Sequence, residues 1–255
     1  LLKLLRKGAV YSRSTSWVFR AAPVTAVAAT AVALTLVPMG GARALLAFPG
    51  DFLMLAGLLG LVRLATIAAA LDTASPFEGM GASREAMISA LAEPGLVLCF
   101  LALARNAGDL SLSGSLGALA ASPWHGDAVV RALVGAAFVV VFLAENARIP
   151  VDNPATHLEL TMIHEAMILE YSGRHLALIE WAGMMKLSLF CYLGIAAFFP
   201  WWIAASRDLR ALGLAFAALV LKLAVIGVGI VLIETGLAKM RIFRLTEFLG
   251  AAFLM

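Results

Sequence analysis

The stretch FLMLAGLLGLVRLATIAAAL runs from Phe52 to Leu71 and is bracketed by Asp51 and Asp72. Its twenty residues hold one charge, Arg63, and no proline. A helix rises 1.5 Å per residue, so a helix of this length matches the roughly 30 Å hydrocarbon core of a bilayer. The stretch therefore predicts a membrane-spanning helix with a cation inside it.

The composition of the whole chain agrees with that prediction. Of the 255 residues, 62% are apolar and 14% are charged, whereas soluble domains are about 45–50% apolar and about a quarter charged. The 19 Lys and Arg against 16 Asp and Glu give a net charge of +3, which is too small to suggest a nucleic-acid partner. Cys99 and Cys191 lie in apolar stretches and are interpreted as small buried hydrophobes rather than disulfide or metal ligands.

Five further apolar segments are long enough to span a membrane. None shows the alternating pattern of a β-barrel strand. We predict an all-α, polytopic transmembrane helix bundle, a single integral membrane domain over residues 1–255, with about six complete spans. The chain begins without an initiator Met, and its last residues, 248–255, look like the opening turns of a further helix cut short, so terminal helices are expected to be missing. The five further segments are Trp17–Pro38, Ala86–Ala104, Ala128–Ala144, Leu176–Ala205 and Arg210–Ala238.

The distribution of Lys and Arg predicts the orientation. If the spans alternate, eleven of these cations fall on one side and five on the other. The side richer in Lys and Arg is expected to be cytoplasmic. It carries the charge-dense loops 72–85, 145–175 and 239–247, so any chemistry or docking is expected on that face.

Six ionisable residues interrupt the predicted spans, and each is costly in lipid unless it is paired or faces water. One interpretation is structural ion pairs between helices, or snorkelling of Glu180 and Glu234 near the span ends. The other, which we favour, is a buried hydrophilic path for protons or ions, since a buried lysine beside an acid can relay charge. The six are Arg63, Glu93, Glu180, Lys186, Lys222 and Glu234.

The loop from Glu145 to His175 carries the densest group of polar residues. Thr156 followed by Glu159 forms a capping-box pattern, and Gly173 is a stop signal, which together predict an amphipathic helix on the cytoplasmic side. His164-Glu165 lacks a second histidine four positions after the first, so the zinc-protease motif fails. A solvated surface helix is the alternative to the interpretation we prefer, an internal acidic lining beside a docking surface.

The loop LDTASPFEGMGASRE at 71–85 has two glycines, Gly79 and Gly81, that could form an anion-binding turn before a helix capped by Ser83. Neither glycine pattern matches a nucleotide-binding loop. A nucleotide site is therefore not expected.

These two loops resemble the complex I subunit 1 family. The segments FEGMGASRE at 77–85, ENARIPVDNP at 145–154, HLELTMIHE at 157–165 and EYSG at 170–173 carry the resemblance, and KMRIFRLTEFLG at 239–250 extends it. The more similar branch is that of formate hydrogenlyase subunit 4 and hydrogenase-4 component C, the membrane anchors of NiFe hydrogenases. Quinone-dependent members are similar around Glu145 and Arg148 but differ in the following stretch.

The resemblance implies a non-catalytic membrane subunit that joins a cytoplasmic redox arm to antiporter-like membrane subunits. Its implied partners are hydrogenase-like large and small subunits, a ferredoxin-like iron–sulfur subunit and the lipid bilayer. No cofactor or metal is expected on this chain, while a NiFe centre and iron–sulfur clusters are expected in the partners. The implied location is the bacterial or archaeal cytoplasmic (inner) membrane. The alternatives are a quinone-binding subunit of a NADH:quinone oxidoreductase and a purely structural anchor.

The resemblance also implies roles for particular residues. No catalytic residue is expected, and the acidic residues of the loops would line a path from the redox arm into the membrane: Asp72, Glu78, Glu145, Asp152, Glu159, Glu165 and Glu170. Charge partners or arm-docking residues would be Arg84, Arg148, Arg241, Arg244 and Glu247.

Overall fold

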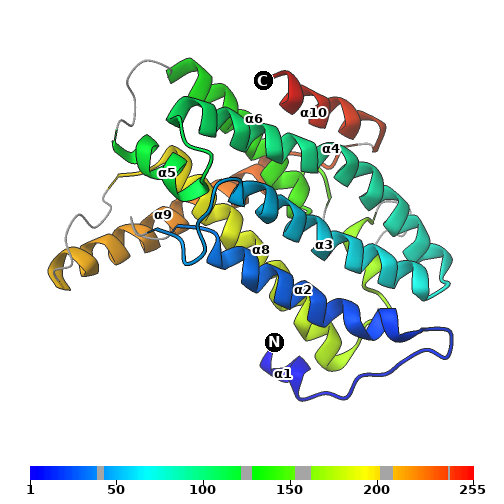
Figure 1. Cartoon of the computed structure of the whole chain (residues 1–255). Helices are drawn as coiled ribbons and strands as arrows, with labels where there is room; N and C mark the ends of the chain where they lie inside the picture. The colour runs from blue at the N-terminus through cyan, green and yellow to red at the C-terminus, as the bar shows by residue number, and fades with distance from the viewer. Residues whose placement is uncertain (39–42, 122–127, 153–161, 202–208, 241) are drawn as a thin grey trace.

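The computed structural model describes residues 1–38, 43–121, 128–152, 162–201, 209–240 and 242–255, and in these ranges all regular structure is helical (Figure 1). The helices are α1 (Leu2–Leu5), α2 (Trp17–Thr35), α3 (Asp51–Asp72), α4 (Pro76–Ala107), α5 (Leu112–Ala121), α6 (Ala128–Glu145), α7 (His164–Met167), α8 (Gly173–Phe198), α9 (Leu209–Gly236) and α10 (Ile242–Leu254).

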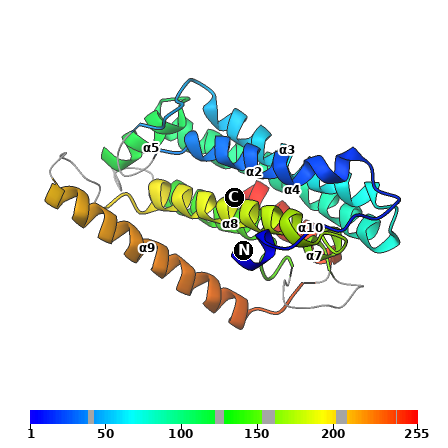
Figure 2. The same cartoon turned by 90° about the horizontal axis from the view of Figure 1, so that it is seen from below.

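The expected membrane bundle is confirmed. Within the described ranges, six helices are long and apolar enough to cross a membrane: α2, α3, α4, α6, α8 and the Gly213–Gly236 part of α9. In their most apolar stretches, five of these helices have 33–50% of their residues buried, whereas α9 has 6%. Figure 2 shows α9 running along the outside of the bundle, beside α8. Five helices therefore form the packed body, and α9 lies at its edge.

The prediction that a loop fills residues 72–85 is wrong. Pro76 occupies the first helical position after an extended Ser75, which is where a missing N–H costs least, and α4 then runs without a break to Ala107. Ser83 is therefore no helix cap, and Gly79 and Gly81 form no anion-binding turn. Close packing explains the glycine at position 81, because a Cβ there would lie 2.9 Å from the Ala166 Cβ and the Ile163 carbonyl oxygen.

The prediction of one helix from Thr156 to Gly173 is also wrong over residues 162–173, the part of this range that the structure describes. Thr156 and Glu159 lie outside the described residues. From 162 onward only His164–Met167 is helical, and Gly173 begins α8 instead of ending a helix. The physical reason is competition for the backbone, because carboxylates of other elements accept hydrogen bonds from the N–H groups of Ile163, His164 and Glu170.

The span expected over Leu176–Ala205 is shifted toward the N-terminus. α8 begins at Gly173 and ends at Phe198. Phe199 leaves the helical conformation because it precedes Pro200, whose ring disfavours the helical conformation of the residue before it.

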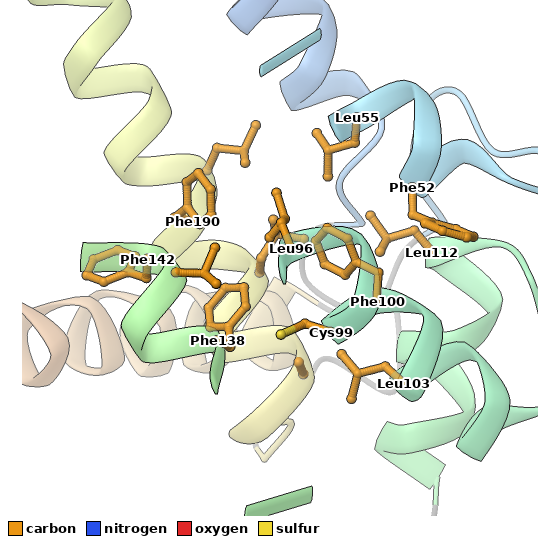
Figure 3. Packing of buried hydrophobic residues seen from close by; sticks show 14 of the residues in the cluster. Phe52, Leu55, Leu96, Cys99, Phe100, Leu103, Leu112, Phe138, Phe142 and Phe190 are labelled. Atoms are coloured by element: carbon orange, nitrogen blue, oxygen red, sulfur yellow. The ribbon is translucent and has the colours of Figure 1, made fainter. Parts of the chain in front are cut away.

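The interior of the bundle is divided along its length. One half holds the largest apolar cluster, in which Phe190 of α8 lies 6.1 Å, between ring centroids, from both Phe138 and Phe142 of α6 (Figure 3). Phe52 and Phe100 extend this cluster across α3 and α4. We call the opposite end, formed by residues 1–16, 73–75, 146–152, 162–172 and 237–240, the loop end. The buried charges described next lie between the apolar half and the loop end.

Candidate functional site

Four helices place charged side chains around one buried cation, Arg63 of α3. Its Nη2 lies 2.7 Å from Glu145 Oε2 of α6, and its Nε lies 2.9 Å from Glu85 Oε1 of α4. Its Nη1 lies 3.5 Å from Glu93 Oε1, also of α4. Lys186 of α8 approaches from the other side, with its Nζ 4.0 Å from Glu145 Oε2. We call these five residues the Arg63 cluster.

Most of the Arg63 cluster is buried, and its formal charges do not sum to zero. The side chains of Arg63 and Glu145 are 4% and 2% exposed, and each would be costly to bury without the other. With all groups ionised, three carboxylates face two cations, which leaves one negative charge in excess. Glu93 is the peripheral member, since its side chain is 39% exposed and its contact with Arg63 is the longest of the three. The cluster therefore has room for one further positive charge, such as a proton.

A pocket of about 240 Å³ opens from the Arg63 cluster toward the loop end. Arg63, Glu85, Glu145 and Lys186 of the cluster line it, together with polar residues from 146–152, from 164–165 and from α8. The second group consists of Asn146, Arg148, Asp152, His164, Glu165 and Glu180. Apolar residues such as Val62, Ile179 and Leu187 line the pocket as well. The buried charges and the polar residues near the loop end therefore face one cavity.

The pocket wall formed by the 162–164 segment is fixed by hydrogen bonds from two sides. Asp152 Oδ2 accepts hydrogen bonds from the N–H groups of Ile163 and His164, at 3.3 and 3.0 Å. Arg84 of α4 donates from Nη1 to the Met162 carbonyl oxygen, at 2.9 Å. These contacts orient His164 and Glu165 at the pocket.

Two other predicted path residues, Asp72 and Glu78, bind backbone instead and do not line the pocket. Asp72 Oδ2 accepts from the N–H groups of Ser16 and Phe19 at the start of α2, at 2.7 and 3.3 Å. Glu78 Oε1 accepts from the N–H of Glu170, at 2.9 Å. Of the seven predicted acidic residues, Glu145, Asp152 and Glu165 therefore line the pocket, whereas Asp72 and Glu78 make contacts that hold the loop end together.

Tyr171 also makes contacts that hold the loop end together. Its ring stacks on Phe19 with 3.9 Å between centroids, and its hydroxyl donates to the Phe19 carbonyl oxygen at 2.8 Å. Burial, with the nearby Glu78 and Asp72 carboxylates, raises the pKa of the Tyr171 phenol. The hydroxyl therefore stays protonated and keeps donating this bond at neutral pH.

The intramembrane charges outside the Arg63 cluster have separate surroundings. Glu180 lines the pocket. Glu234 of α9 pairs with Arg148, with 3.2 Å between Oε1 and Nη1. Lys222 of α9 donates to the carbonyl oxygens of Phe199 and Trp201, just beyond the end of α8. A cation there stabilises the C-terminal carbonyl groups of α8, so the structure gives Lys222 a local partner away from the cluster.

The remaining predicted residues lie apart from the pocket. Arg244 is an exposed residue of α10, as is Glu247, and Glu170 is exposed at the loop end. Glu159 and Arg241 lie outside the described residues. Across the ranges that the structure describes, His, Cys, Asp and Glu form no group of three that could hold a metal ion.

Glu85 is the member of the Arg63 cluster that the sequence pattern does not single out. The pattern assigns it to a loop, whereas it lies on α4 seven residues after Glu78 and eight before Glu93. These spacings place the three carboxylates on one side of a helix. Recognising Pro76 as a helix start would have revealed that shared face.

Fold and site together define a multi-pass helical membrane protein with a charged pocket inside the bundle. Residues 1–255 match the NADH dehydrogenase family, and the chain belongs to that family. It is 30% identical over 243 residues to formate hydrogenlyase subunit 4 of Escherichia coli, covering 95% of this chain and 78% of the relative. It is 32% identical over 240 residues to hydrogenase-4 component C of the same organism, covering 94% and 74%.

A more distant relative is a subunit of the NADH-quinone oxidoreductase of Rubrobacter xylanophilus, which is 26% identical over 190 residues, covering 74% of this chain and 56% of the relative. Among solved structures, a chain of the membrane-bound sulfane sulfur reductase, an archaeal respiratory membrane complex, has a TM-score of 0.78 at 19% identity. That match covers 99% of this chain and 82% of the other, so the two chains share the fold.

Proposed function

We propose that this chain is the membrane subunit that links the redox arm of a hydrogenase-type or complex I-like respiratory complex to ion movement in the membrane. Its similarity to subunits of formate hydrogenlyase and hydrogenase-4 supports the first part. The observation that carries the second part is the Arg63 cluster, in which two cations and two carboxylates are largely buried beside a pocket and Glu93, 39% exposed, adds one negative charge.

The proposed partners follow the relatives. Hydrogenase-like large and small subunits and a ferredoxin-like iron–sulfur subunit, which would hold the NiFe centre and the iron–sulfur clusters, bind at the loop end. Antiporter-like membrane subunits bind along the bundle. The loop end faces the cytoplasm, because it carries the excess of Lys and Arg.

In the proposed mechanism, a redox step in the arm moves or recharges the 146–172 segment. Opposite charges within about 4–6 Å shift a carboxyl pKa by about one to three units, so a small displacement of a charged group near the pocket is enough to move a proton. The proton enters through the pocket and is held by the Arg63 cluster. Glu93 then passes it onward, because it is the exposed member.

The test measures ion translocation and electron-transfer turnover in the reconstituted complex. Glu145→Gln removes the excess negative charge and is expected to lower ions moved per turnover at least about tenfold. Glu93→Gln, at the periphery of the cluster, tests the same role with less risk to folding. Asp109→Asn changes an exposed carboxylate near the other end of the bundle and should retain coupling. Normal assembly with unchanged coupling in both Glu145→Gln and Glu93→Gln would contradict the proposal.

A structural anchor is the second candidate, and the ion pairs joining α3, α4 and α6 favour it. This function requires only that the helices stay together. It predicts that Arg63→Met combined with Glu145→Leu, which replaces the closest pair with apolar groups, leaves both assembly and coupling intact. The coupling function predicts assembly without ion movement.

A further inference from the structure

The short segment from Arg148 to Asp152 forms part of the pocket wall but has little regular structure of its own. It follows the end of α6, and Ala147 has a positive φ of 49°. Its internal support comes from hydrogen bonds to nearby carbonyl oxygens, such as Arg148 N to Leu143 O at 2.9 Å and Val151 N to Arg148 O at 2.8 Å. Side-chain contacts with another element are therefore needed to set where its charged groups point.

Those contacts come from one corner of the chain, the end of α9 and the turn after it. Arg148 Nη1 lies 3.2 Å from Glu234 Oε1, and Asp152 Oδ1 lies 2.6 Å from Lys239 Nζ. Between these two ion pairs, the Met240 N–H donates to the Pro150 carbonyl oxygen at 2.9 Å. The pocket segment supplies the cation of one pair, Arg148, and the anion of the other, Asp152. The α9 corner supplies the two opposite charges.

The ion pairs are partly buried, so breaking one of them costs more free energy than breaking a pair on the surface. The Asp152 side chain is 3% exposed and that of Lys239 is 17% exposed, while Arg148 and Glu234 are 31% and 24% exposed. Removing one member of such a pair takes compensating charge away from a poorly solvated group.

Helix α9 has few other attachments to the packed body. Only 6% of its most apolar stretch is buried, and apolar packing comes from a single row that includes Leu223, Ile226 and Ile230. Its other polar attachment, Lys222, lies about three turns away and contacts the carbonyl groups after α8. The two ion pairs are therefore the main polar connection between α9 and the pocket.

We propose that Glu234 and Lys239 are positioning residues of the charged pocket. Glu234 keeps the Arg148 guanidinium at the outer part of the pocket and away from the Glu145 carboxylate. Lys239 neutralises Asp152 while that carboxylate holds the N–H groups of Ile163 and His164. The α9 corner thereby sets the charge distribution that the coupling function requires. This assignment gains its functional meaning from the proposed coupling role, but the positioning itself can be measured separately.

The experiment uses the intact complex and two independent measurements. The first is amide hydrogen exchange at residues 148, 149, 151, 152, 163 and 164, and the second is ions translocated per electron-transfer turnover. Glu234→Gln and Lys239→Met are expected to speed exchange at these amides at least about tenfold, equivalent to about 1.4 kcal/mol of local opening free energy. Coupling should fall at least about threefold while turnover is retained.

Conservative variants separate positioning from a general loss of structure. Glu234→Asp and Lys239→Arg keep the charges and should restore most of the protection and coupling. Thr235→Val is the matched control on α9, because the Thr235 hydroxyl bonds back to Val231 O of its own helix. It should leave both measurements unchanged.

The outcomes distinguish this inference from the proposed function. Faster exchange with normal coupling, both here and in Glu145→Gln, would uphold the positioning role and refute the coupling function. Unchanged exchange in both Glu234→Gln and Lys239→Met would overturn the inference. Failure of the two conservative variants to restore protection would overturn it as well.

Discussion

At the scale of single residues, Arg63 shows that a membrane sequence reveals where a buried charge lies but does not reveal its partners. The cation interrupts an apolar run, so its need for a partner could be predicted. The partners could not, because Glu85, Glu93 and Glu145 come from two other helices and meet Arg63 only through tertiary packing. The ion pairing observed here fits either interpretation of the intramembrane charges, since paired groups can be structural or can exchange protons.

Replacing Arg63 with Gln tests the energetic weight of the cluster. Three carboxylates would then share a site with Lys186 alone, and we expect a loss of about 3–5 kcal/mol in the free energy of unfolding. Thermal unfolding in detergent, followed by circular dichroism, measures this loss. Arg105→Gln, at the exposed end of α4, is the control, and equal melting temperatures for the two variants would contradict this prediction.

At the scale of helices and loops, α4 and α7 show where local patterns mislead. Two glycines near Glu78 are typical of a turn, yet α4 continues through both. The backbone of the 162–167 segment packs directly against Gly81, and this close approach is a tertiary contact that the sequence pattern does not reveal. The same segment loses its predicted long helix because Asp152 and Glu78 bind its N–H groups.

Paired alanine substitutions at the two glycines test this packing. Gly81→Ala pushes Ala166 and Ile163 away from α4, and we expect it to destabilise the chain by about 1–3 kcal/mol. Gly79→Ala meets nothing within 4 Å and should stabilise by up to about 1 kcal/mol through higher helix propensity. Chemical or thermal unfolding in detergent gives the two differences. The same sign of effect at both positions would show that Gly81 has no special packing role.

At the scale of the whole molecule, the largest apolar cluster and the Arg63 cluster occupy different parts of the bundle. The aromatic side chains around Phe138 and Phe190 belong to the first, and the Arg63 cluster and its pocket lie toward the loop end. Figures 1 and 2 show that α9 lies beside this body instead of within it. A pocket that reaches the buried charges from the loop end gives the molecule a direction, which the proposed coupling function requires.

Single cysteines introduced at the two ends test the proposed orientation. Val10→Cys places an exposed thiol at the loop end and should react with a membrane-impermeant maleimide only from the cytoplasmic side. Leu110→Cys is exposed near the opposite end and should react only from outside. The natural Cys99 and Cys191 are buried, so the parent chain provides the unlabelled control. Reversed labelling would place the loop end outside the cell.

The sequence alone determined the class of this protein, because length and hydropathy suffice to predict helices that cross a bilayer, and because its loop motifs resemble one family. It also located most of the charges that needed explanation. Only the tertiary structure decided which charges meet. Glu85 joins Arg63 because α4 begins at Pro76, while Asp72 and Glu78 hold backbone. Spacing along one helix predicts a face, but contacts between helices depend on how those helices pack.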